Sequence, residues 1–115
     1  MRIKSVVGLG VAAAALATLG LAGTASANSV TLYYNSNYAG ESVTFYGNVP
    51  NLAGYSFPSD GSVKNNAASA WNNDSSYAFI WYNSNYAGSY DTLAPYSGEA
   101  RLVNTYNEDA AISFS

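Results

Sequence analysis

The chain has 115 residues with no cysteine and no histidine, and its four basic residues face seven acidic ones, a net charge of −3. The two missing residue types remove disulfide bonds, the usual zinc ligands and most nucleophile–base pairs of enzymes. From residue 28 onward only Lys64 and Arg101 are basic against the same seven acidic residues, a net charge of −5, which excludes a basic surface for nucleic acid.

Residues 1–27 have the pattern of a secretory signal peptide. Arg2 and Lys4 give a positive start, residues 6–22 are an apolar run rich in Ala and Gly, and the sequence ASA at 25–27 fits a cleavage site. A membrane anchor is the alternative, because the run approaches a spanning length. The run is only weakly hydrophobic, however, and no basic residue follows it until Lys64. We predict cleavage after residue 27 and export of residues 28–115 as one domain without a membrane segment.

The first predicted strands follow directly. Residues 30–34 combine β-branched and aromatic side chains, and in residues 42–46 Val43 and Phe45 alternate with polar neighbours. The segment between these strands is rich in Asn, Ser and Gly, as a turn requires. A third run of this kind, residues 77–82, is again β-branched and aromatic, and no sustained helical period of apolar residues follows the signal peptide.

An internal repeat organises these elements. The heptapeptide YNSNYAG at residues 34–40 recurs identically at 82–88, and NNAAS at 65–69 is echoed by EDAAI at 108–112. Chance recurrence through biased composition does not explain seven identical residues. The repeat predicts two units of about four strands, residues 28–71 and 77–115, related by a pseudo-twofold axis. The connector between them is too short for independent domains, so we expect one shared core.

The spacing aromatic-x4-aromatic-x-Gly occurs once in each unit and resembles the Greek-key signature of the βγ-crystallin superfamily. A glycine at the end of a folded-over hairpin allows a positive φ at low cost, and the two aromatic rings can stack over that fold. The resemblance implies an all-β sandwich of two Greek-key motifs with about eight strands. The residues that carry it are Tyr33, Tyr38, Gly40, Trp81, Tyr86 and Gly88.

The same superfamily carries a calcium signature of two Asn or Asp residues, two variable residues, then Ser or Thr and Ser. Both copies here are incomplete, since Ala70 replaces the last Ser of the first and Ile112 replaces the Ser or Thr of the second. The resemblance implies at most weak calcium binding, with dissociation constants of roughly 10⁻⁴ to 10⁻³ M, and no required cofactor. The alternative is that these side chains only tie a turn. The candidate ligands are Asn65, Asn66, Ser69, Glu108 and Asp109.

Within bacteria, the chain resembles the exported metalloproteinase-inhibitor family of actinomycetes. Residues 32–40, 63–70, 82–92 and 102–107 carry this resemblance. That family commonly has disulfides, whereas this chain has no cysteine and has Tyr90 where members often have one. The resemblance implies a secreted, monomeric, non-catalytic inhibitor of an extracellular metalloproteinase.

The segment 54–62, GYSFPSDGS, is the candidate inhibitory loop. We expect an extended loop stiffened by Pro58 that enters the protease cleft as a substrate mimic, with Tyr55, Phe57 and Asp60 as further contact residues. A backbone carbonyl or the Asp60 carboxylate could then meet the zinc of the protease. The alternative is that Tyr55 and Phe57 are core residues of a third strand.

Other functions have less support in the sequence. Glu108 and Asp109 are adjacent and point to opposite faces of a strand, and the serines have no histidine to activate them. Asp91 and Glu99 would need to be brought together by folding to act on a glycoside. A calcium-linked structural or stress protein, and a small toxin or wall-binding module suggested by the abundance of Tyr, Asn, Ser and Gly, are the alternatives.

Overall fold

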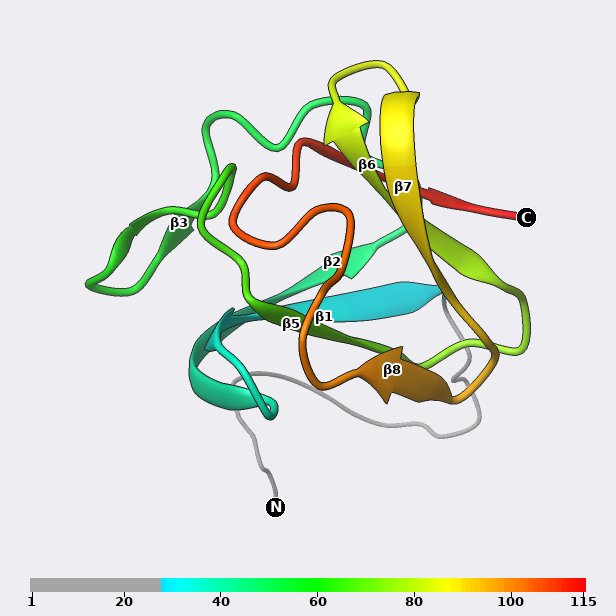
Figure 1. The fold of residues 1–115 in the computed structure, drawn as a ribbon, viewed down its shortest axis with the longest axis horizontal. Helices are drawn as coiled ribbons and strands as arrows, with labels where there is room; N and C mark the ends of the chain where they lie inside the picture. The colour runs from blue at the N-terminus through cyan, green and yellow to red at the C-terminus, as the bar shows by residue number, and fades with distance from the viewer. Residues whose placement is uncertain (1–27) are drawn as a thin grey trace.

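The computed structural model describes residues 28–115, in which strands, turns and loops occur without any helix (Figure 1). The predicted signal peptide, residues 1–27, lies outside the described residues. Residues 28–115 therefore contain no helix that could span a membrane. The strands are β1 Ser29–Asn35, β2 Ala39–Tyr46, β3 Ser56–Phe57, β4 Gly61–Ser62, β5 Ser69–Asn72, β6 Ala78–Asn83, β7 Ala87–Leu93, β8 Ser97–Glu99 and β9 Ala111–Phe114.

The strands form two main sheets that exchange one segment each. The first sheet has the order β2-β1-β5-β8 and the second the order β7-β6-β9, so β8 of the second unit pairs with β5 of the first. In the reverse direction Val49 of the first unit pairs with Ile112 of β9 through backbone hydrogen bonds of 2.8 and 2.9 Å. The all-β, two-motif fold is confirmed. Residues 28–115 contain nine strands, compared with the expected number of about eight. Strands β3 and β4 add a separate short hairpin, whereas Val49 forms only an isolated bridge where a further strand would lie.

The core lies between the two sheets and comes from both units. In β1 the side chains of Val30 and Leu32 point inward, and in β6 those of Ala78 and Ile80 do so, as the period of two along a strand requires. The cluster they form consists of Val30, Leu32, Phe45, Val49, Leu52, Phe57, Val63, Ala67, Ala70, Ala78, Ile80, Leu93, Leu102 and Ile112. The two units therefore share one core.

The repeated heptapeptide builds the same hairpin twice. Gly40 and Gly88 have φ angles of 79° and 81°, the positive values expected for them. A Cβ atom at Gly40 would also lie 2.6 Å from the Asn35 amide nitrogen, and one at Gly88 would lie 2.6 Å from that of Asn83. Each glycine is thus favoured by its backbone angle, and a side chain there would also have to displace the amide end of the asparagine five residues before it.

The signature aromatics pack differently in the two units. The rings of Tyr33 and Tyr38 meet edge to face with centroids 5.8 Å apart, and Trp71 contacts Tyr38 at 5.7 Å. In the second unit the Trp81 ring lies 4.8 Å from that of Tyr90 on the neighbouring strand β7. The hairpin backbone is therefore repeated more closely than the aromatic packing around it.

Candidate functional site

The segment predicted as the inhibitory loop is a tight hairpin. Strands β3 and β4 pair Ser56 with Ser62 and Phe57 with Gly61, and residues 58–60 form the turn. In Figure 1 this hairpin, near the label β3, projects away from the two main sheets. Pro58 fixes φ near its usual negative value and Gly61 adopts a φ of 86°, so the chain reverses instead of running extended. The expected extended loop is therefore replaced by an exposed, three-residue tip.

The base of the hairpin is anchored by aromatic packing. Phe57 is only 2% exposed, and its ring meets Tyr34 edge to face at 5.6 Å. Tyr55 is 45% exposed, although its ring contacts Phe45 at 5.1 Å. Phe57 is thus a core residue of the third strand, and its side chain is not available to a partner. The exposed candidate contact residues are Tyr55, Pro58 and Asp60.

A carboxylate that the sequence analysis did not single out holds the tip. Glu41 on β2 accepts hydrogen bonds from the Ser59 backbone N–H at 2.8 Å, the Asp60 backbone N–H at 3.0 Å and the Ser59 hydroxyl. The bonds from Ser59, and then those from Asp60, lower the pKa of Glu41 below its ordinary value. Partial desolvation, followed by the negative charge of Glu41, raises the pKa of Asp60. Glu41 is therefore an ionised clamp across the hairpin turn.

The second unit holds its corresponding loop in a similar way. Asp91 on β7 is 3% exposed and accepts from the backbone N–H groups of residues 103, 104 and 105 at 2.8–3.2 Å, and from the Thr105 hydroxyl at 2.6 Å. Folding does bring Glu99 on β8 beside Asp91, and one oxygen of Glu99 is buried without a partner. Burial first, and then the charge of Asp91, raise the pKa of Glu99 to about 7. Asp91 is buried and occupied by these bonds, so the pair is part of the loop's support.

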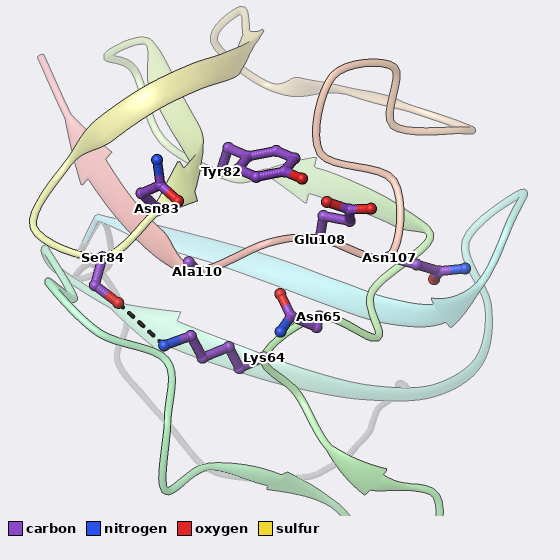
Figure 2. Close-up of a pocket in the computed structure, with 8 residues that line it drawn as sticks. All are labelled: Lys64, Asn65, Tyr82, Asn83, Ser84, Asn107, Glu108 and Ala110. Carbon is purple, nitrogen blue, oxygen red and sulfur yellow. Dashed lines mark hydrogen bonds between the residues drawn. The ribbon is translucent and has the colours of Figure 1, made fainter.

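Two of the residues predicted as calcium ligands line one polar cavity. Asn65 and Glu108 face a cavity of about 450 Å³ between the units, shown in Figure 2. The Tyr82 hydroxyl faces Glu108, which raises the pKa of this phenol by hydrogen bonding and by its negative charge. Lys64 lines the same cavity and donates from Nζ to the Ser84 hydroxyl at 3.1 Å. The cavity thus contains one carboxylate and one ammonium group.

The other predicted ligands are placed elsewhere and have other partners. The Ser69 hydroxyl donates to the Asn35 carbonyl oxygen at 2.7 Å and accepts from the Tyr38 N–H at 3.0 Å, beneath the first repeated hairpin. Asn66 lines a second cavity of about 310 Å³ and donates from its side chain to the Ser62 carbonyl oxygen at 2.8 Å. These contacts tie turns, as the alternative interpretation of the signature proposed.

Asp109, like Ser69, is fully buried. Its side chain has no exposed surface, Oδ1 accepts from the Ala67 N–H at 3.0 Å and Oδ2 has no partner. Burial raises the pKa of Asp109 to about 7, although the backbone N–H groups around it act in the opposite direction. Within residues 28–115 no three acidic side chains gather as a metal-binding group. The predicted ligands therefore divide between two cavities: Asn65 and Glu108 line the first, Asn66 lines the second, and calcium binding at either stays a prediction.

Comparison with protein families gives one match. The model of peptidase inhibitor family I36 matches residues 22–93, which include the β3–β4 hairpin, Glu41 and both repeated hairpins. None of the curated proteins compared with the chain matches it.

Comparison with solved structures gives βγ-crystallin domains. A domain studied for the evolution of the eye-lens βγ-crystallin fold has a TM-score of 0.67 at 21% identity, covering 84% of this chain and 93% of that one. A βγ-crystallin from an archaeon has a TM-score of 0.62 at 17% identity, covering 78% and 100%. Spherulin 3a from Physarum polycephalum has a TM-score of 0.58 at 23% identity, covering 84% and 90%. At these identities the likeness concerns the fold.

Proposed function

The chain belongs to peptidase inhibitor family I36, and from this premise we propose that it is a secreted, non-catalytic inhibitor of an extracellular metalloproteinase. The observation that carries the proposal is the projecting β3–β4 hairpin, whose turn at residues 58–60 is exposed yet tied by three hydrogen bonds to Glu41. A surface element of this kind can enter a cleft without first losing conformational freedom.

In the proposed mechanism the hairpin tip occupies the protease cleft and no covalent bond changes. Pro58 restricts the chain on one side of the turn, and Tyr55 presents an aromatic ring near the base. Asp60 at the tip supplies a carboxylate, a group that zinc accepts as an oxygen ligand, and a tip carbonyl oxygen is the alternative contact. Blocking the metal and the cleft together would stop hydrolysis.

A titration tests this proposal. Residues 28–115 are added in increasing amounts to a thermolysin-type metalloproteinase, and the remaining activity is measured with a small peptide substrate. We expect loss in proportion to the inhibitor added. Asp60→Ala should raise the inhibition constant about tenfold by removing one contact of the tip, about 1.4 kcal/mol. Thr44→Val, an exposed change on β2 that removes a bond to Thr31, is the matched control and should inhibit like the wild type.

Calcium binding is a second candidate function, favoured by the cavity that brings Asn65 and Glu108 together. The ammonium group of Lys64 in the same cavity opposes a cation, and a single carboxylate gives little charge. We therefore expect binding in the millimolar range at best. The melting temperature of the wild-type chain should barely differ between calcium and a chelator. A rise of several degrees in calcium would show that binding is tighter than we expect and would favour calcium binding as a function.

A further inference from the structure

In each unit a carboxylate on the second strand holds a loop, although the 48-residue offset of the repeat pairs Glu41 with Ser89 and Asp91 with Val43. In the first unit Glu41 of β2 accepts hydrogen bonds from the N–H groups of Ser59 and Asp60, in the turn between β3 and β4. In the second unit Asp91 of β7 binds the N–H groups of the loop 103–105, which precedes β9. The fold therefore uses a carboxylate on the second strand of each unit to fix the backbone of the loop that follows.

The two loops differ in whether their own side chains are buried in the core. The loop 103–105 is anchored independently, because its last residue, Thr105, and the residue before it, Leu102, are both buried. All three residues of the turn 58–60 are exposed and add nothing to the core. The chain has no cysteine that could cross-link the turn. Apart from the pairing of the two-residue strands at its base, the tip is thus held in one conformation by its hydrogen bonds to Glu41.

We infer that Glu41 is the positioning residue of the inhibitory tip, and that its negative charge sets the affinity for the protease without contacting it. This inference rests on the proposed function. A carboxylate that accepts two N–H groups and a hydroxyl makes charge-assisted bonds, which are stronger than those of a neutral acceptor. Without them the turn must be ordered when it binds, and that cost appears as weaker inhibition.

The inference makes a graded set of variants informative. Glu41→Gln keeps the size of the side chain but removes its charge and one acceptor, and we expect an inhibition constant raised about tenfold. Glu41→Ala removes every bond and should weaken inhibition further, whereas Ser59→Ala removes only the hydroxyl donor and should have the smallest effect. Thr44→Val on the same strand serves as the control with wild-type inhibition. All variants should still unfold cooperatively, because the tip lies outside the core, but Glu41→Gln and Glu41→Ala should melt a few degrees lower, since the lost bonds form only in the folded chain.

Two further measurements separate positioning from direct contact. Amide hydrogen exchange of the free protein should be about tenfold faster at Ser59 and Asp60 in Glu41→Gln, and unchanged elsewhere. A loosened tip should also be cut by the target protease during long incubation, while the wild-type tip stays intact. Unchanged exchange combined with weaker inhibition would make Glu41 a contact residue and overturn the inference.

The failure of this inference can be told apart from the failure of the proposed function. If the wild-type chain inhibits the protease and Glu41→Gln inhibits equally well, the role of Glu41 is refuted and the proposed function stands. If the wild-type chain inhibits no metalloproteinase, the proposed function fails and the role of Glu41 in inhibition fails with it. Weaker inhibition and faster exchange at the tip in Glu41→Gln, in a variant that still folds cooperatively, support both.

Discussion

Gly98 is the position where the exchange of strands between the two units is most sensitive to a single methyl group. It lies on β8 opposite Trp71 of β5. A Cβ atom at this position would be 2.2 Å from the Ala70 carbonyl oxygen and 3.0 Å from the Trp71 Cα and Cε3 atoms. The carbonyl oxygen and the Cα atom belong to the backbone of β5, so they cannot turn aside as a flexible side chain would. Gly98→Ala must therefore push β8 away from β5.

The size of the effect follows from that displacement. A contact at 2.2 Å must lengthen by about 1 Å to become tolerable, which stretches the hydrogen bonds between β5 and β8. Overpacking of this kind costs about 1–3 kcal/mol, and we expect the upper end because the atoms that clash are backbone. For a domain of this length, about 3 kcal/mol corresponds to a fall of roughly 12–24 °C in melting temperature.

Urea unfolding followed by tryptophan fluorescence measures this change, since Trp71 lies against Gly98. Gly47→Ala is the matched control, because nothing lies within 4 Å of a Cβ atom there and only its φ of +94° opposes a side chain. The control should lose about 1 kcal/mol. Equal stability of Gly98→Ala and the wild type, or equal losses in the two variants, would refute the close approach of β8 and β5.

Three further predictions concern charge, the repeated hairpins and calcium. Because the pKa of Glu99 is raised from 4.5 to about 7, its contribution to stability is complete below pH 4.5 and is lost as the pH rises through about 7. Glu99→Gln should therefore flatten the fall in stability between pH 5 and 8, by about 1 kcal/mol after solvent screening, and an unchanged pH profile in urea unfolding would contradict this. Gly40→Ala and Gly88→Ala should destabilise the protein by similar amounts, about 1–3 kcal/mol each, because both have positive φ and in both the Cβ atom would displace only the flexible end of an asparagine side chain; a large difference in thermal unfolding would show that the hairpins are not equivalent. Lys64→Ala should increase the stabilisation by calcium in melting experiments, since it removes the ammonium group from the cavity with Glu108, and no increase would exclude that cavity as the calcium site.

The repeated hairpins could be predicted from the sequence because their requirements are local. An identical heptapeptide, with a glycine where φ must be positive, specifies the same turn wherever it occurs, and Gly40 and Gly88 differ by only 2° in φ. The alternation of Val30 and Leu32 with polar or half-buried neighbours likewise marks a strand with one buried face. These features depend on residues that are close together in the sequence.

The strand exchange could not be predicted in the same way. Strand β8 has the sequence Ser-Gly-Glu, which contains no apolar side chain and no strand pattern. It forms because Gly98 allows close approach to β5. In the second sheet both sides of β6 are already paired, with β7 and with β9. Such pairing depends on contacts between residues that are far apart in the sequence, so a local sequence pattern does not predict it.

The candidate site shows the same division. The sequence singled out the segment that carries Pro58 and Asp60 but predicted an extended loop instead of a hairpin. Phe57 could be a contact residue or a core residue, since an aromatic side chain beside a turn serves either role. Its contact with Tyr34 decides for the core. Glu41 is separated by 18 residues from the nearest residue it binds, and an isolated glutamate on a predicted strand carries no signal of that contact.

The most direct test of the account is a titration of a purified thermolysin-type metalloproteinase with residues 28–115, followed by analysis of the inhibitor for cleavage. The account predicts a linear loss of activity that reaches completion near one inhibitor per protease, with the hairpin tip intact, and weaker inhibition by Glu41→Gln and Asp60→Ala. Full protease activity in the presence of a large molar excess of the wild-type chain, or rapid cleavage of that chain as an ordinary substrate, would contradict it.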